Sequence, residues 1–236
     1  MKILCVIPVR GGSKGIPGKN SKLIAGLPLV AWTILQARDA NFELDVLVST
    51  DSPELAKISS SFGADVPFLR PAELATDLAA TEPVMQHAID FRASLNAKPD
   101  AIMLLQATSP IRFLGTIDAA IKQFIEQGLD SLVGVVAQTP FLWRQNPETH
   151  PLYDTQARPR RQDLSASEMF YRETGSLYIT RTSSFEESAN RICQKTGIFV
   201  MREAEGVDID TEVDFAIAEQ LLKKYKNEII RDGAAD

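Results

Sequence analysis

The stretch ILCVIPV at residues 3–9 is apolar throughout, and it runs directly into RGGSKGIPGKN at residues 10–20. An uninterrupted apolar run of this length predicts a strand buried on both faces of a parallel sheet. The loop after it has four glycines and three cations. Glycines allow turns that bring backbone N–H groups close to an anion, and cations neutralise that anion. The two stretches together predict a polyphosphate site at the end of the first strand.

The familiar phosphate-binding motifs do not fit this loop. The P-loop pattern requires a glycine where Ser13 stands and a hydroxyl where Asn20 stands. The dinucleotide pattern G-x-G-x-x-G fails because Gly11 and Gly12 are followed next by Gly15. These departures argue against a kinase-like P-loop and a plain NAD site. A flexible surface turn with solvated cations remains the alternative.

Composition indicates a compact protein with an acidic balance. The chain has 236 residues, 44% hydrophobic and 24% charged, which suits a single domain over residues 1–236. Its net charge of −6 does not favour nucleic acid as a partner. No apolar stretch is long enough for a membrane span, and the apolar start is too short for a signal peptide. The two cysteines, Cys5 and Cys193, are too few for a disulfide scaffold, so we expect a cytoplasmic protein.

Apolar runs and amphipathic stretches alternate along most of the chain. We expect helices over residues 28–40, 53–62, 81–95, 116–127 and 211–231, and further strands over 45–50, 100–106, 131–137 and 198–202. This alternation predicts an α/β protein with a doubly wound, mainly parallel sheet. Ligands of such sheets bind beyond the carboxyl ends of the strands, where Arg10, Asp51 and Gln106 stand.

Residues 140–190 interrupt this alternation. The segment has four prolines in its first twenty residues and a basic group formed by Arg158, Arg160 and Arg161. A strand-like stretch follows at 171–180. We interpret the segment as an inserted, hairpin-bearing lobe that covers a site or forms a dimer contact.

Asp208-Ile209-Asp210 is the second strong signal. In an extended segment, residues two apart face the same side, so both carboxylates would point to one spot. Such a pair repels itself unless a cation lies between its members, and Mg²⁺ prefers few carboxylates together with phosphate oxygens. The alternative is a solvated acidic turn before a helix, whose positive end favours Asp210.

Two further segments keep two interpretations open. QATSPIR at residues 106–112 places polar side chains in the sheet crevice, or it forms a loop capped by Thr108 and Ser109 with Arg112 on the surface. Arg70 lies in a pocket or is one more solvated arginine.

Five motifs in order carry a resemblance to a known family. They are RGGSKGIP at residues 10–17 with KN at 19–20, VSTD at 48–51, RPAELA at 70–75, LQATSP at 105–110 and DIDTE at 208–212. From about residue 2 to 222 the chain resembles the acylneuraminate cytidylyltransferases, the CMP-sialic acid synthetases. Related enzymes for legionaminate, pseudaminate and 3-deoxy-octulosonate share the plan.

The resemblance implies a fold, a reaction and partners. The fold would be a nucleotidyltransferase-type, Rossmann-like three-layer sandwich with a small inserted dimerisation lobe, and the enzyme a homodimer. It would join CTP to the anomeric hydroxyl of a 2-keto-3-deoxy nonulosonic acid, releasing pyrophosphate. The expected cofactor is Mg²⁺, with Mn²⁺ as an alternative ion.

The resemblance also implies roles on the nucleotide side. It assigns Arg10, Lys14 and Lys19 to the triphosphate, and Arg70 to the cytosine. The remaining nucleotide-binding positions would be Gly11, Gly12, Ser13, Asn20 and Thr81.

On the acceptor side, it assigns Gln106 to the sugar acid and Arg172 to its carboxylate. Asp208 and Asp210 would hold the metal ion. Arg10, Lys19 and Asp210 form the expected catalytic set, with Asp210 assisting proton removal. The competing hypotheses are a nucleotidyltransferase for another sugar acid or another nucleotide–sugar pair, and a catalytically idle binding protein with the same fold.

Overall fold

A computed structural model describes residues 1–12 and 15–231. The strands of the central sheet are β1 (Ile3–Pro8), β4 (Leu44–Ser49), β5 (Ala101–Leu104), β6 (Ser131–Gln138), β9 (Phe170–Arg181) and β10 (Thr196–Met201). The helices are α1 (Leu29–Arg38), α2 (Pro53–Ser61), α3 (Thr81–Ser94), α4 (Thr116–Glu126), α5 (Thr182–Ser188) and α6 (Glu212–Ile229). Two short hairpins pair β2 (Leu23–Ile24) with β3 (Leu27–Pro28), and β7 (Trp143–Arg144) with β8 (His150–Pro151). Single 3₁₀ turns span Ala72–Leu74, Arg161–Asp163, Ala166–Glu168 and Glu203–Gly206.

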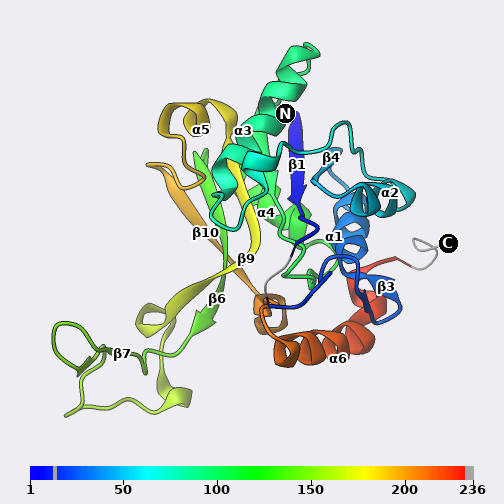
Figure 1. The fold of residues 1–236 in the computed structure, drawn as a ribbon. Coiled ribbons are helices and arrows are strands. Elements are labelled where there is room, and N and C mark those ends of the chain that lie inside the picture. Colours follow the sequence, from blue (N-terminus) through cyan, green and yellow to red (C-terminus); the bar gives the residue numbers. More distant parts are fainter. Residues whose placement is uncertain (13–14, 232–236) are drawn as a thin grey trace.

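The sheet has the strand order β10-β6-β9-β5-β1-β4 and is mostly parallel (Figure 1). β1 pairs in parallel with both β4 and β5, and β10 pairs in parallel with β6. Only β9, among the described strands of this sheet, runs antiparallel to its neighbours β5 and β6. The predicted α/β class with a mainly parallel sheet is confirmed. β9 is the exception because the chain turns back after β6 without a crossover helix.

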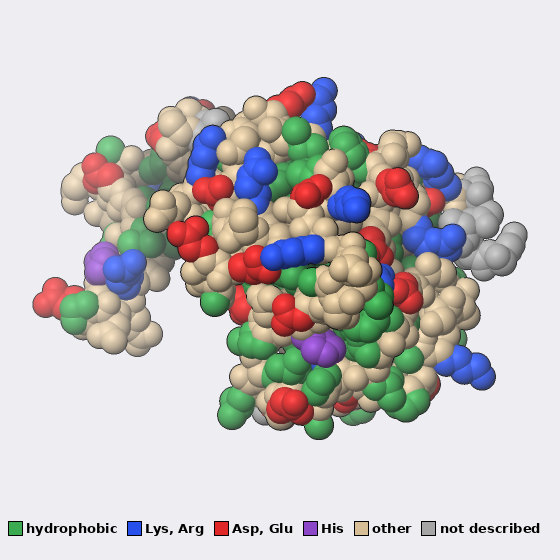
Figure 2. Space-filling model, turned by 90° about the horizontal axis from the view of Figure 1, so that it is seen from above, with side chains coloured by type: hydrophobic (Ala, Val, Ile, Leu, Met, Phe, Trp, Pro, Cys, Tyr) green, Lys and Arg blue, Asp and Glu red, His purple; other side chains and the backbone are tan. Residues whose placement is uncertain are grey.

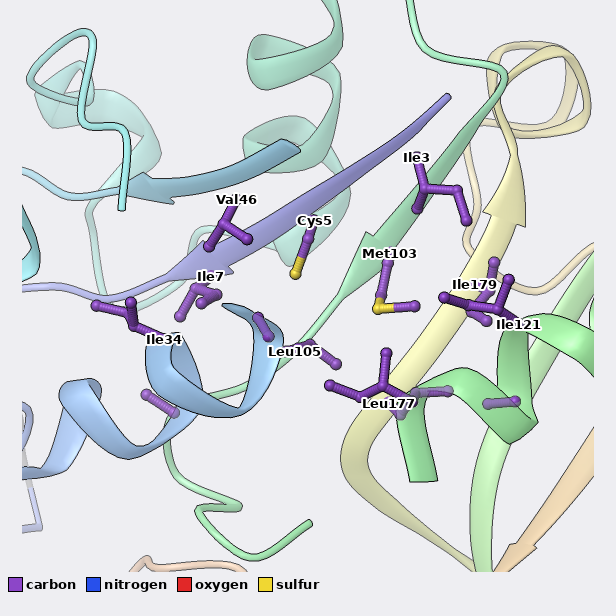
Figure 3. Packing of buried hydrophobic residues seen from close by; sticks show 14 of the residues in the cluster. Ile3, Cys5, Ile7, Ile34, Val46, Met103, Leu105, Ile121, Leu177 and Ile179 are labelled. Carbon is purple, nitrogen blue, oxygen red and sulfur yellow. The ribbon is translucent and has the colours of Figure 1, made fainter. Parts of the chain in front are cut away.

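Helices cover both faces of the sheet. On one face, α1 and α4 pack on side chains of β1, β5 and β9; Figure 3 shows Cys5, Ile7 and Ile34 in this layer. On the other face, α3 and α5 supply Met85, Ile89 and Phe185. A third cluster joins the outer side of α1 to α6. Because α1 is covered on both sides, it is apolar nearly all round, and even its Trp32 is fully buried.

The starts of α2 and α6 follow the expected capping chemistry. The Ser52 hydroxyl accepts a hydrogen bond from Leu55 N at 3.3 Å, with Pro53 at the first helical position of α2. At α6, Asp214 N donates to the Thr211 hydroxyl at 3.3 Å, and the Asp214 carboxylate accepts from Thr211 N at 2.8 Å. The predicted caps at Ser52 and Thr211 are confirmed.

The inserted lobe ends earlier than predicted. Residues 139–169, which include β7 and β8, form an arm that projects from the body between β6 and β9 (Figure 1). β9 itself lies inside the central sheet, and α5 packs on the body, so the predicted boundary near residue 190 was wrong. The first four residues of β9 are exposed, and its long buried run starts only at Ser176. Because the start of β9 is polar, the sequence pattern assigned the strand to the inserted lobe instead of the central sheet.

The surface is mixed in charge. Figure 2 shows acidic and basic side chains interspersed on one face, with the arm extending to the left. Within the described ranges, no helix has both the length and the apolar character needed to traverse a bilayer.

Candidate active site

A cavity of about 240 Å³ opens at the carboxyl ends of β1 and β5. The chain passes from β1 to β4 on one side and later to β5 on the other, so this is the switch point of the sheet. Six residues predicted for the site line the cavity: Arg10, Lys19, Asn20, Arg70, Thr81 and Gln106. The remaining wall comes from Pro8, Val9, Ala107 and Thr108.

The loop after β1 is held by polar contacts at its start. The Asn20 amide donates to the Arg10 carbonyl at 3.1 Å, and Gly11 N donates to the Asp51 carboxylate at 3.0 Å. The Arg10 guanidinium pairs with the Asp77 carboxylate. Gly11 and Gly12 are exposed and are not among the residues that line the cavity. Ser13 and Lys14, also predicted for this site, lie outside the described residues.

Arg70 lies in a pocket, which confirms one of the two interpretations and excludes a solvated arginine. It is only 7% exposed, and its guanidinium donates to the Val9 carbonyl at 2.6 Å. Burial lowers the pKa of Arg70, and the Asp51 carboxylate, 3.9 Å away, opposes that shift. Arg70 Nε is buried and has no hydrogen-bond partner within the described structure. A buried donor that lacks an acceptor costs about 1–3 kcal/mol.

The cationic loop meets the Asp-Ile-Asp segment through Lys19. The Lys19 ammonium donates to the Ile209 carbonyl and lies 3.8 Å from Asp210 Oδ1. A Cβ added at Gly15 would come under 3.0 Å from the Asp210 carbonyl oxygen, so only a glycine allows the two backbones to approach this closely. Ile209 is fully buried, as the alternation predicts. Two stretches far apart in the chain therefore meet at Lys19, which lines the cavity, whereas Asp208 and Asp210 do not line it.

The two aspartates differ in their surroundings. Asp210 is exposed, with 80% of its side chain accessible, whereas Asp208 is half-buried and accepts a hydrogen bond from Ser109 at 3.3 Å. Ile209 N donates to the Thr108 carbonyl at 2.9 Å, which ties the pair to the loop after β5. Within residues 1–12 and 15–231, no group of three or more His, Cys, Asp and Glu side chains could hold a metal ion. Any ion here would depend on two carboxylates and on oxygens from a ligand.

Gln106 and Arg172 lie differently with respect to the cavity. Gln106 lines it, and its side-chain oxygen packs against Gly175. Arg172 is exposed on β9 and does not line the cavity; it donates to the Gly206 carbonyl at 2.9 Å. Gly206 comes two residues before Asp208, so Arg172 borders the aspartate segment instead.

Three residues near the site carry contacts that the sequence did not predict. Asp77 pairs with Arg10, and Ser109 is fully buried and reaches both Asp208 and the Thr174 carbonyl. Arg112 is also fully buried, so the interpretation that placed it on the surface was wrong. The only sequence signal for Ser109 and Arg112 was their place in a polar loop around Pro110, after a buried strand. No sequence signal indicated a role for Asp77.

A mostly parallel sheet with a cationic cavity at its switch point is an architecture of nucleotide-handling α/β proteins. Residues 4–234 match the family model described as cytidylyltransferase, and the chain belongs to this family. It is 33% identical to a CMP-N,N'-diacetyllegionaminic acid synthase of Legionella pneumophila, covering 98% of this chain and 100% of the relative. It is also 33% identical to N-acylneuraminate cytidylyltransferase A of Danio rerio, over 97% of this chain but only 54% of that protein.

A solved structure agrees in fold. The CMP:2-keto-3-deoxy-manno-octonic acid synthetase complexed with CTP superposes with a TM-score of 0.65 and 17% identity, covering 95% of this chain and 99% of that one. At this identity the similarity shows the fold alone. It confirms the predicted nucleotidyltransferase-type architecture.

Proposed function

We propose that this protein transfers CMP from CTP to the anomeric hydroxyl of a 2-keto-3-deoxy nonulosonic acid and releases pyrophosphate. Membership of the cytidylyltransferase family and the names of two relatives support this class of substrates. The observation that carries the proposal is the meeting of the cationic loop with the Asp-Ile-Asp segment through Lys19, beside a cavity that also holds Arg70 and Gln106.

Arg70, Arg10 and Lys19 would bind the nucleotide. Arg70 lines the cavity, and its guanidinium N–H donors suit an acceptor atom of the cytosine ring. Arg10 and Lys19 would neutralise the triphosphate by charge-assisted hydrogen bonds. Arg10 and Lys19 pair with Asp77 and Asp210, so bound phosphates would replace these carboxylates as partners of the two cations.

Asp208 and Asp210 fit a Mg²⁺ ion. A pair of carboxylates without a third protein ligand is what Mg²⁺ uses when substrate phosphates complete its shell. When bound, the ion would withdraw charge from the phosphates. Mn²⁺ would suit the same oxygen ligands.

The chain's own residues would do the remaining work by positioning and charge stabilisation. The anomeric oxygen forms a bond to the α-phosphorus of CTP while the bond from that phosphorus to the pyrophosphate oxygen breaks. The hydroxyl proton passes to the Asp210 carboxylate, whose side chain is 80% exposed. Arg10 and Lys19 hold the leaving pyrophosphate. Gln106 and Arg172 would orient the sugar acid.

The direct test is pyrophosphate release by the purified protein with Mg²⁺. ATP, GTP, UTP and CTP are each supplied with N-acetylneuraminic, legionaminic, pseudaminic or 3-deoxy-octulosonic acid. We expect release with CTP and at least one nine-carbon acid. Release with another nucleotide, or only with the eight-carbon acid, would contradict the proposal, and CTP binding without turnover on any acid would favour an idle binding protein.

We also propose that the protein is a homodimer held together by the arm. The arm and the adjoining start of β9 expose Trp143 at 60%, Leu152 at 37% and Phe170 at 41%. Large apolar side chains grouped on a projection favour a protein interface.

Light scattering after gel filtration should therefore give twice the chain mass. Trp143→Ser should raise the dimer dissociation constant by about 10-fold or more, since a buried tryptophan anchor often contributes 2 kcal/mol or more. Leu95→Ser removes an equally exposed apolar side chain away from the arm, and it should leave the mass unchanged. A monomeric wild type at micromolar concentration would refute the arm interface.

The compartment we propose is the cytoplasm. Cys5 is buried and Cys193 is partly exposed, and both are free thiols. Burial raises the pKa of the Cys5 thiol to about 12, which keeps it unreactive. Free thiols in this arrangement suit a reducing environment.

A further inference from the structure

Arg112 is a buried cation whose partners are neutral. It is fully buried, and burial lowers its pKa to about 10, so it stays charged at neutral pH. Its hydrogen-bond acceptors are carbonyl, amide and hydroxyl oxygens. Within the described ranges, no carboxylate forms an ion pair with it. Burying a charged side chain costs folding free energy unless its donors are hydrogen-bonded, and the acceptors around Arg112 meet this need.

Those contacts join the loop after β5, which lines the cavity, to strand β9. Arg112 Nη2 donates to the Gln106 carbonyl at 3.0 Å. Nε and Nη2 both donate to the Ser176 carbonyl on β9, at 2.9 and 2.5 Å. One planar guanidinium thus sets the separation between the loop after β5 and the middle of β9.

Helix α1 holds the guanidinium in place. Arg112 Nη1 donates to the Gln36 side-chain oxygen at 3.0 Å, and the Gln36 amide donates to the Pro110 carbonyl at 2.7 Å. Gln36 is itself buried. The position of the Arg112 guanidinium is therefore fixed by a helix that is buried on nearly all sides.

A close contact between Gly175 and the Gln106 side chain lies next to these hydrogen bonds in the chain. Gly175 precedes Ser176 and has φ +69°, in the region that favours glycine. A Cβ there would fall under 3.0 Å from Gln106 Oε1. The orientation of the Gln106 amide therefore depends on two features. Residue 175 has no side chain, and Arg112 maintains the distance between the loop after β5 and β9.

We propose that Arg112 is a positioning residue for the acceptor substrate: it fixes the Gln106–Gly175 contact and so places the Gln106 amide where the sugar acid binds. This rests on the proposed function. Arg112 does not line the cavity, and it acts through Gln106. The nucleotide side, built from Arg10, Lys19 and Arg70, has no hydrogen bond to Arg112 in the described structure.

The test compares Arg112→Lys with Arg92→Lys. A lysine keeps the charge but cannot reach both carbonyls with a planar fork. Arg92 is the control: it is also buried, but it bonds the carboxylates of Asp45, near the start of the edge strand β4, and of Asp65. We expect Arg112→Lys to raise KM for the sugar acid about 10-fold or more, with KM for CTP changed by about twofold or less. Arg92→Lys should lower the melting temperature without separating the two KM values.

A second variant reaches the same contact from its other side. Gly175→Ala displaces the Gln106 amide directly, so it should also raise KM for the sugar acid and leave KM for CTP unchanged. If Arg112→Lys fails to fold, this variant still tests whether the Gln106–Gly175 contact positions the acceptor. Combined with Arg112→Lys, its effect should be less than the product of the two single effects, since both act through Gln106.

Equal changes in both KM values, or a lower melting temperature with both KM values unchanged, would overturn the role of Arg112. A wild type that releases no pyrophosphate with any acid would instead overturn the proposed function, and this inference with it.

Discussion

Asp210→Asn is expected to reduce kcat by about 100-fold or more while CTP still binds. The substitution keeps the shape of the side chain and removes the charge that would hold the metal ion and accept the proton. General-base assistance alone typically contributes about 10²–10⁴-fold. Because Asp210 is exposed and its backbone packs against Gly15, the fold should not change. Steady-state pyrophosphate release and calorimetric CTP titration, both with Mg²⁺, measure the two effects.

Glu212→Gln is the matched control for that variant. It removes one negative charge two residues further on, from a side chain that pairs with Lys22 at the surface. Its kcat should stay within about twofold of the wild type, because exposed ion pairs contribute little. If Asp210→Asn turned over as fast as Glu212→Gln, the aspartate pair would have no part in the reaction.

Lys19→Met should lower kcat/KM for CTP by about 100-fold. Charge-assisted hydrogen bonds to a buried group contribute about 1.5–3 kcal/mol, which corresponds to about 10- to 150-fold. The variant also leaves the buried Ile209 carbonyl without its donor, so a fall in melting temperature should accompany the loss. Inhibition by added pyrophosphate should weaken in parallel, because the missing cation would serve the departing phosphates.

Lys22→Met is the control for Lys19→Met. It tests whether the effect on kcat/KM for CTP depends on the position of the lysine or only on the loss of one positive charge. Lys22 stands three residues along the same loop, bonds Glu212 and covers the Phe215 ring, outside the cavity. It should change kcat/KM for CTP by less than about threefold. Unaltered CTP affinity in Lys19→Met would refute the assignment of this lysine to the triphosphate.

Elements with strong local signals could be predicted from the sequence. The Ser52–Pro53 start of α2 and the Thr211 cap of α6 are read from a few neighbouring residues, and both occur as expected. The buried run at residues 3–8 likewise became β1, which pairs in parallel with a strand on each side. Local chemistry decides these features, so one stretch of chain suffices to find them.

Features decided by distant contacts could not be predicted in this way. β9 begins with four exposed residues, so its membership of the sheet depends on pairing with β5 and β6 and not on its own pattern. The burial of Arg112 depends on acceptors from α1 and β9 that no spacing rule reveals. Asp77 meets Arg10 only because the loop before α3 folds back over the crevice. Six of the predicted residues line one cavity, but the contacts that connect them to their neighbours could not be predicted.

The bond between Lys19 and the Ile209 carbonyl spans 190 positions of the chain. Domains emerge from the ribosome with their N-terminal part first, so the cationic loop is made long before its acidic counterpart. A nascent or truncated chain that stops before residue 208 would display the loop without the carboxylates. Activation of a sugar acid thus becomes available only after residue 210 has been made, and fragments that end before residue 208 would be unable to consume CTP.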